Sequence, residues 1–215
     1  MKIPLSNKLK KRMHIDTGTL QDEVVEILYD VENKLILHGG TAIWRCYGGN
    51  RFSEDLDLYL SNPEGFDQLF KKRITEKGLF LNKFKITDNL IFSKISNGTT
   101  EIRVELNFSA KKKGTVKPYE KIDGSILNVF TLSPEELLLE KVITYKNRRF
   151  IRDVYDIFHL LNYITIDSGV KESVNTLLKN IQRPIDEKNL SAIVYSGAVP
   201  SFEQIISQIK KRFSR

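Results

Sequence analysis

Cysteine and long apolar runs are scarce in this sequence of 215 residues, and each shortage excludes a class of protein. The one cysteine, Cys46, excludes an internal disulfide framework and a cysteine-rich zinc site. No apolar run approaches the ~18 residues needed to span a bilayer. The N-terminal segment is basic, with no apolar stretch of the kind that a signal peptide carries. We therefore expect a cytoplasmic protein without membrane spans.

The composition is that of a globular protein with a basic surplus. Hydrophobic residues make up 40% and charged residues 28% of the chain. Lys and Arg number 34 against 27 for Asp and Glu, a formal net charge of +7. This surplus favours polyanionic partners such as nucleic acid.

Hydrophobic periodicity divides the chain into an α/β part and a helical part. The α/β part has predicted helices over 20–34, 41–47 and 64–77 and predicted strands over 35–38, 56–60, 79–87, 90–96 and 101–108. Ser133-Pro134-Glu135-Glu136 has the residues of a helix start, and helices are predicted from there on, over 134–147, 151–163, 168–181 and 201–213. We place the domain boundary between residues 131 and 132, which gives domains 1–131 and 132–215.

Two aspartates two positions apart on a predicted strand are the first candidate site residues. Asp55 and Asp57 project from one face of that strand, roughly 6–7 Å apart at ~3.3 Å per residue. Neighbouring carboxylates repel each other unless a cation lies between them, and oxygen ligands suit Mg²⁺ or Mn²⁺ bridging substrate phosphates. Glu105, on the polar face of the alternating strand 101–108, is the candidate third carboxylate.

A glycine turn precedes the aspartates. Gly39, Gly40 and Thr41 lie where a predicted strand meets a predicted helix. Glycines there let the backbone approach an anion, the N–H groups of a helix start point at phosphate, and Thr41 adds a hydroxyl donor. No Gly-Lys-[Ser/Thr] follows, so this is not a Walker A loop. The turn and the aspartates together predict phosphoryl or nucleotidyl transfer.

A second group of charged residues lies in the helical part, and it has two interpretations. Its members are Lys141, Lys146, Arg149, Arg152, Asp153 and Asp156. The basic side chains can hold the β- and γ-phosphates of a nucleotide. Alternatively the group is a salt-bridged helix surface, with Arg149–Asp153 and Arg152–Asp156 as i,i+4 pairs.

Three motifs carry a family resemblance, which spans roughly residues 35–160. The first motif of the AbiEii-type nucleotidyltransferase toxins, in the polymerase-β-like superfamily, is similar to Leu37-His38-Gly39-Gly40-Thr41-Ala42 followed by Arg51-x-Ser53-x-Asp55-Leu56-Asp57-Leu58. The family's lysine motif resembles Leu132-Ser133-Pro134-Glu135-Glu136-Leu137 leading to Lys141 and Lys146. Its last motif resembles Arg152-Asp153-Val154-Tyr155-Asp156-Ile157, with Arg152 in place of the usual lysine.

The resemblance implies a fold, an activity and partners. The fold is a mixed sheet with flanking helices, followed by a helical region that closes over the nucleotide. Members of the family transfer a nucleoside monophosphate from an NTP with Mg²⁺ or Mn²⁺, and some modify the 3′ ends of tRNA. They are commonly paired with an antitoxin protein.

The resemblance also implies roles for individual residues of this chain. Asp55 and Asp57 would bind the metals, with Glu105 as the third candidate ligand, and Asp153 would be essential near the nucleotide. Glu105 or Asp153 would help to deprotonate the acceptor. The predicted nucleotide-contacting residues are Gly39, Gly40, Thr41, Arg51, Ser53, Lys141, Lys146 and Asp156.

These observations predict a metal-dependent nucleotidyltransferase that acts on an RNA acceptor, for which tRNA is the prediction. The enzyme would serve as the toxin of a toxin–antitoxin or abortive-infection system. Basic runs over 8–12, 111–113 and 146–152 would contact the RNA backbone, which predicts salt-sensitive binding. Two alternatives stay open. One is the same chemistry on a small molecule or a protein, and the other is a non-catalytic module that binds nucleotide or nucleic acid.

Overall fold

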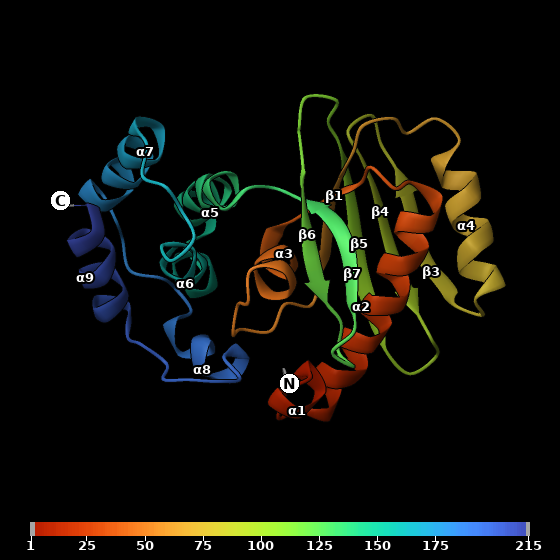
Figure 1. Cartoon of the computed structure of the whole chain (residues 1–215), viewed down its shortest axis with the longest axis horizontal. Coiled ribbons are helices and arrows are strands. Elements are labelled where there is room, and N and C mark those ends of the chain that lie inside the picture. Colours follow the sequence, from red (N-terminus) through yellow and green to blue (C-terminus); the bar gives the residue numbers. More distant parts are fainter. Residues whose placement is uncertain (1–2, 214–215) are drawn as a thin grey trace. The chain divides into compact units, whose positions relative to one another are not determined.

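The computed structural model describes residues 3–213, and its contacts divide them into two compact units. One unit, the sheet unit, contains residues 3–46 and 52–132. The other, the helical unit, contains residues 133–213 together with the short segment Tyr47–Arg51. Figure 1 shows the elements of each unit in sequence colours. Lys2, the first residue of the basic N-terminal segment, lies outside the described residues.

The sheet unit contains a mixed seven-stranded sheet of order β3-β4-β5-β2-β1-β7-β6. Its strands are β1 Ile36–His38, β2 Leu56–Leu60, β3 Phe80–Ile86, β4 Leu90–Ser96, β5 Glu101–Phe108, β6 Thr115–Glu120 and β7 Ile126–Thr131. Its helices are α1 Leu5–Lys8, α2 Arg12–Val31, α3 Gly39–Cys46 and α4 Phe66–Glu76. β2 runs parallel to β5 and β1 runs parallel to β7, while the other neighbours are antiparallel.

Period-2 alternation along β2 and β5 gives the sheet an apolar face and a polar face. Leu58 of β2 and its register partner Leu106 of β5 are both fully buried. α2 contacts β5, α4 contacts β3, and Figure 1 shows both helices on one side of the sheet. Asp57 and its partner Glu105 belong to the opposite, half-exposed face. Hydrophobic burial therefore places the acidic side chains of these strands on the face turned away from α2 and α4.

The helical unit begins at the predicted helix start. Ser133 caps α5 (Pro134–Arg148) in a capping box: the Glu136 N–H donates to Ser133 Oγ at 3.2 Å, and the Ser133 N–H donates to Glu136 Oε2 at 3.1 Å. The remaining elements are α6 Ile151–Leu160, α7 Ser168–Lys179, the 3₁₀ helix η1 Glu187–Asn189, α8 Leu190–Ile193 and α9 Phe202–Phe213. α5 packs on α6 and α7, and α9 packs on α6 and α7.

The segment Tyr47–Arg51 belongs to the helical unit although it lies between α3 and β2 in the sequence. Asn50 Oδ1 accepts a hydrogen bond from the Tyr155 hydroxyl at 2.6 Å. The Tyr195 hydroxyl donates to the Gly49 carbonyl at 2.7 Å, and Arg51 forms a β-bridge with Val194. These contacts join residues more than a hundred positions apart in the sequence.

Two further differences from the sequence-based elements have physical reasons. The helix predicted over 20–34 is α2, which begins eight residues earlier, at Arg12. Its first turns contain buried polar residues and Gly18 instead of an apolar repeat, and Gly18 allows a close approach, because a Cβ there would lie 2.4 Å from Ile122 Cδ1. β6 and β7 lie in the segment 115–131, where no element was predicted, and Pro118 sits in β6 because that strand is a sheet edge.

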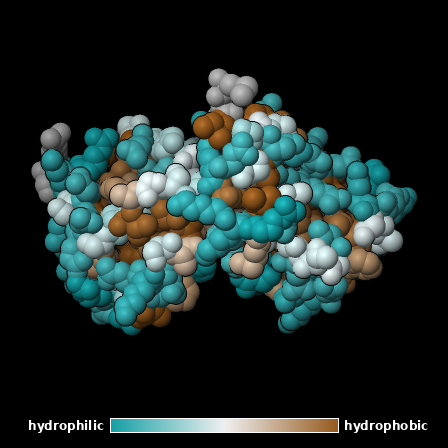
Figure 2. Space-filling view, turned by 90° about the horizontal axis from the view of Figure 1, so that it is seen from below, coloured by the Kyte–Doolittle hydropathy of each residue, from teal (hydrophilic) through white to brown (hydrophobic). Residues whose placement is uncertain are grey.

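The surface follows the composition. The face in Figure 2 is largely hydrophilic, with hydrophobic side chains gathered in patches. Large apolar side chains such as Met13, Ile143 and Ile185 are more than half exposed. Within residues 3–213 no helix is both long enough and apolar enough to span a membrane.

Candidate active site

The glycine turn and the aspartate strand lie directly side by side in the sheet unit. β1 ends at His38 and α3 begins at Gly39, which has a φ of +70°. A Cβ at Gly39 would lie 2.4 Å from Asp57 Oδ2, so only glycine fits beside this carboxylate. The Thr41 hydroxyl donates to the Asp55 carbonyl at 2.6 Å. The Gly39 backbone thus lies against the Asp57 side chain, and the Thr41 side chain holds the backbone of Asp55.

Three carboxylates face the same side of the sheet next to this turn. Asp57 and Glu105 are register partners on the parallel strands β2 and β5, and Asp55 precedes Asp57 by two residues. Burial raises the pKa of Glu105 above its usual value, and the negative charge of Asp57 raises that pKa further, against the opposing effect of Arg103. The negative charges of Asp57 and Asp55 therefore add to burial in disfavouring the ionised form of Glu105.

Arg103, which the sequence analysis did not single out, neutralises part of this charge. Its Nε donates to Asp55 Oδ1 at 2.8 Å and its Nη2 donates to Asp55 Oδ2 at 2.5 Å, a bidentate pair. This pairing raises the pKa of Arg103. The sequence held a signal for Arg103, because it lies two positions before Glu105 on the same polar face of β5.

The donor set of the three carboxylates fits a hard divalent cation. Carboxylate oxygens with mutual repulsion suit Mg²⁺ or Mn²⁺. No three side chains of His, Cys, Asp or Glu form a ready-made metal-binding group in the part of the chain that the structure describes. Asp55 is paired with Arg103 instead. A site with all three carboxylates as ligands therefore requires Arg103 to release Asp55.

The remaining predicted residues of the sheet unit are Gly40, Thr41 and Ser53. Gly40 and Thr41 are buried, and the Thr41 hydroxyl is committed to the Asp55 carbonyl. Ser53 is half-buried, and its carbonyl accepts a hydrogen bond from Gln21 Nε2 at 2.9 Å. What the turn offers to an anion is the backbone N–H groups at the start of α3.

Four of the predicted residues, Arg51, Lys141, Asp153 and Asp156, form a buried ion cluster in the helical unit. Arg51 binds Asp156 through two hydrogen bonds of 2.5 Å. Lys141 Nζ lies 2.9 Å from Asp156 Oδ2 and 3.4 Å from Asp153 Oδ1. Arg148, also missed by the sequence analysis, donates twice to Asp153 at 2.8 Å. The cluster ties α5, α6 and the segment Tyr47–Arg51 together.

Burial and pairing control the protonation of this cluster. Burial alone would raise the pKa of Asp156, but Arg51 and Lys141 more than compensate, so that this pKa lies below its usual value. The side chains of Arg51, Lys141 and Arg148 are all paired with these two carboxylates.

The i,i+4 pairs expected in the second interpretation of this group are wrong in detail. Asp153 is paired with Arg148 and Lys141 and not with Arg149, because α5 ends at Arg148, so Arg149 and Asp153 do not belong to one continuous helix. Asp156 is paired with Arg51 and Lys141 and not with Arg152. Lys146 is exposed on another side of α5.

Comparisons with known proteins place these observations in a family. The model of the nucleotidyl transferase AbiEii toxin family, type IV toxin–antitoxin system, matches residues 26–208. No curated protein sequence matches the chain.

Solved structures with the same fold include JHP933 from Helicobacter pylori, at a TM-score of 0.61 and 18% identity over 92% of this chain and 90% of that one. The MenT4 nucleotidyltransferase toxin from Mycobacterium tuberculosis H37Rv has a TM-score of 0.59 and 20% identity over 95% of this chain and 85% of that one. The antibiotic-resistance factor ANT(2'')-Ia has a TM-score of 0.51 and 14% identity over 74% and 90%.

These likenesses establish the polymerase-β-like fold, with its mixed sheet and flanking helices. The family match covers most of the chain and includes the turn, the aspartates and the buried ion cluster. This chain therefore belongs to the AbiEii family of nucleotidyl transferase toxins and is a nucleotidyltransferase.

Proposed function

We propose that the protein transfers a nucleoside monophosphate from an NTP to the 3′ hydroxyl of an RNA, with tRNA as the preferred acceptor. The observation that carries the proposal is the group of Asp55, Asp57 and Glu105 beside the Gly39 turn. A carboxylate group next to a helix start is the arrangement needed to handle a triphosphate with its cations.

The three carboxylates would hold divalent cations, which when bound neutralise the developing charge on the phosphate oxygens. The N–H groups of Gly40 and Thr41 at the start of α3 would donate to the triphosphate. These roles use the backbone of the turn, and they leave the Thr41 hydroxyl in its hydrogen bond to Asp55.

The chemical step needs a proton acceptor. The acceptor hydroxyl oxygen forms a bond to the α-phosphorus, the bond from that phosphorus to the β-bridging oxygen breaks, pyrophosphate leaves, and the hydroxyl proton passes to a carboxylate. We assign this role to Glu105, which is partly exposed on the polar face of the sheet. Asp153 is fully buried and bound by Arg148 and Lys141, which supports a positioning role for it.

An RNA acceptor is supported by the charge of the chain. The net charge of +7 and the exposed loop residues Lys111 and Lys113 favour a polyanion over a cationic small molecule. The type IV toxin–antitoxin family supports a second partner, a cognate antitoxin protein. We also propose that the protein acts in the cytoplasm, where NTP and tRNA are available.

The direct test uses the purified protein with each α-³²P-labelled NTP, Mg²⁺ and total tRNA. The wild type is expected to label RNA. The variants Asp57→Asn and Glu105→Gln are expected to lower the initial rate by about 10²–10⁴-fold. Glu101→Gln is the matched control, because Glu101 lies on the same strand and face but pairs with Lys94.

Three outcomes would contradict the proposal. Labelling of an aminoglycoside or a protein in place of RNA would change the acceptor class. Equal labelling by wild type and Asp57→Asn would remove the carboxylates from catalysis. RNA binding without pyrophosphate release, equal with and without Mg²⁺, would indicate a non-catalytic binding module.

A further inference from the structure

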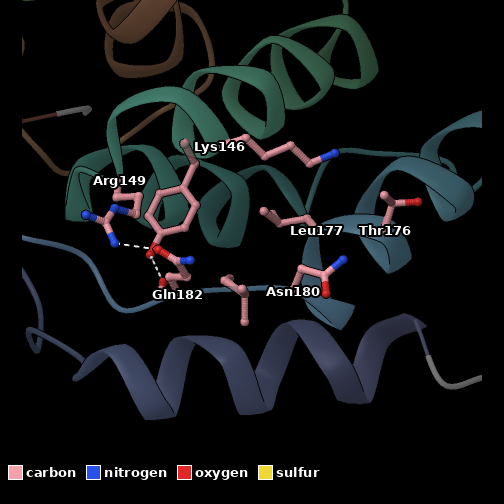
Figure 3. Close-up of a pocket in the computed structure, with 8 residues that line it drawn as sticks. Lys146, Arg149, Thr176, Leu177, Asn180 and Gln182 are labelled. Carbon is pink, nitrogen blue, oxygen red and sulfur yellow. Dashed lines mark hydrogen bonds between the residues drawn. The ribbon is translucent and has the colours of Figure 1, made fainter.

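A pocket of about 330 Å³ lies within the helical unit, separate in its residues from the buried ion cluster. Its walls come from α5, from the last turns of α7 and from the segment 180–182, as Figure 3 shows. Nothing in the proposed chemistry uses this pocket, although Lys146, one of its walls, belongs to the lysine motif of the sequence.

The inner wall of the pocket is apolar. Tyr145 and Leu177 are almost fully buried, and Ile181 completes this wall. The Tyr145 hydroxyl donates to the Gln182 carbonyl at 2.6 Å, which satisfies its polar end and leaves its ring as packing surface. An apolar inner wall of this kind accepts a flat ring system by burial.

The rim is polar and cationic. Figure 3 shows Lys146 extending over Leu177, while Arg149 lies at the other end of the pocket beside Gln182. Neither cation forms an ion pair with an acidic side chain among residues 3–213, and Arg149 donates a hydrogen bond to Gln182 Oε1. The lining residues include Asn180 and Gln182, whose amides donate and accept hydrogen bonds, but no carboxylate.

The backbone at Arg149 adds an independent observation. Arg149 has a φ of 54° and is the one non-glycine residue with positive φ in the described chain. It occupies the left-handed C-cap of α5, a position where glycine carries no steric penalty. A bulky side chain at a position that favours glycine is a feature of functional sites.

We propose that this pocket binds one nucleotide of the RNA acceptor, with the base against the apolar wall and the phosphodiester between Lys146 and Arg149. The inference rests on the proposed RNA acceptor. The apolar wall would contact the face of the base, and the amide groups would contact its edge. The two cations, which form no ion pair in the described part of the chain, would contact the phosphate.

A nucleotide within a strand fits this pocket better than a free NTP. A triphosphate carries several charges and a divalent cation, which needs carboxylate ligands, and the lining of the pocket contains none. A phosphodiester carries one negative charge, which two cations satisfy. In this proposal Lys146 contacts the RNA acceptor, whereas its motif implied contact with the triphosphate of the NTP.

The test measures RNA affinity without NTP, so that binding is separated from chemistry. Fluorescence anisotropy with labelled tRNA, over a series of salt concentrations, compares the wild type with Lys146→Ala, Arg149→Gly and the double variant. We expect the double variant to bind about 5- to 20-fold more weakly and the salt slope to fall by about one, because both cations contact a single phosphate. Lys171→Ala is the matched control, because Lys171 is exposed on α7 but does not line the pocket.

Arg149→Gly separates a binding role from a folding role. Glycine relieves the backbone at the left-handed C-cap, so the melting temperature of this variant should equal or exceed that of the wild type while its RNA affinity falls. A lower melting temperature together with unchanged RNA affinity would make the residue structural and overturn the proposal.

A parallel titration with a non-hydrolysable NTP distinguishes the two sources of a nucleotide. The expected result is unchanged NTP affinity in the pocket variants. Weaker NTP binding with unchanged RNA binding would assign the pocket to the NTP and overturn the inference. If the wild type labels RNA and the pocket variants bind RNA as well as the wild type does, only the pocket proposal is wrong. If the wild type neither binds nor labels RNA, the proposed acceptor and the pocket proposal are both wrong.

Discussion

The carboxylates of the sheet unit and those of the helical unit are embedded in opposite ways. On the sheet, Asp57 and Glu105 are partly exposed, and Asp55 is paired with the guanidinium of Arg103. In the helical unit, Asp153 and Asp156 are fully buried and outnumbered by cations. One group has partly exposed negative charge to offer to a ligand, while the carboxylates of the other are already paired with cations of the same unit.

The burial and the partners of a motif aspartate therefore indicate whether it serves chemistry or stability. Breaking a buried ion pair leaves an uncompensated charge, so substitution of such a residue mainly lowers the stability of the folded protein. Partly exposed carboxylates that repel one another lower stability, and a bound cation would offset that repulsion. The following predictions test whether this separation between chemistry and stability holds.

The largest effect is expected for activity at the sheet carboxylates. Asp57→Asn should lower nucleotidyl transfer by about 10²–10⁴-fold, while the free energy of unfolding stays within about 0.5 kcal/mol of wild type or rises, because a like-charge contact is lost. Urea denaturation monitored by circular dichroism measures the second quantity. If Asp57→Asn also lowered the free energy of unfolding by more than about 0.5 kcal/mol, the distinction between the two groups would be lost.

Next in size is the stability effect at the buried cluster. Asp156→Ala leaves Arg51 buried without its carboxylate, and it should reduce the free energy of unfolding by about 3–5 kcal/mol. Glu172→Ala, an exposed acidic residue on α7, should change it by less than about 0.5 kcal/mol. A loss below about 1 kcal/mol for Asp156→Ala would mean that the cluster is not a stabilising element.

A smaller, pH-dependent effect follows from the lowered pKa of Asp156. The folded state holds this proton less tightly than the unfolded state, so the stabilisation is complete above the unfolded pKa of about 3.9. It is lost as pH falls below that value and through the lower folded pKa. The stability difference between wild type and Asp156→Ala should therefore shrink on acidification below about pH 4. A constant difference from pH 7 to pH 2 would contradict the pairing.

The smallest effect is expected at Arg103. Arg103→Gln frees Asp55 from its bidentate partner, so Mn²⁺ should bind the protein without nucleotide about 2- to 10-fold more tightly, as measured by electron paramagnetic resonance. Lys94→Gln, on the same face but paired with Glu101, is the control. Weaker Mn²⁺ binding by Arg103→Gln would show that Arg103 does not compete with the cation.

Short-range patterns in the sequence were sufficient for the carboxylate group. Alternation along β5 put Glu105 on the polar face, and the sequence located the glycine turn between β1 and α3. The approach of that turn to a phosphate stays a prediction, while the proximity of Gly39 to Asp57 was not predicted. The capping box at Ser133 was readable for the same reason, since its hydrogen bonds span only three residues. The mixed sheet also agrees with the fold that the motifs implied.

Long-range pairing was beyond the sequence. The partner of Asp156 is Arg51, 105 residues away, and no local pattern indicates that pair. The i,i+4 rule failed for Arg149 and Asp153 because it assumes one continuous helix, and Arg149 ends α5. The pocket depends in the same way on the packing of α5 and α7 and on the turn of the chain after Lys179, which periodicity does not report.

The position of Tyr47–Arg51 in the helical unit has a consequence for how the protein can be divided. A truncation after Leu132 would carry this segment along but delete Tyr155, Asp156 and Tyr195, the side chains that hold Asn50, Arg51 and Gly49. In the fragment, the Arg51 guanidinium would lack the Asp156 carboxylate, and the segment 47–51 would lack the hydrogen bonds from Tyr155 and Tyr195. Chimeras between family members should therefore exchange residues 47–51 together with everything from Ser133 onward, as a single discontinuous cassette.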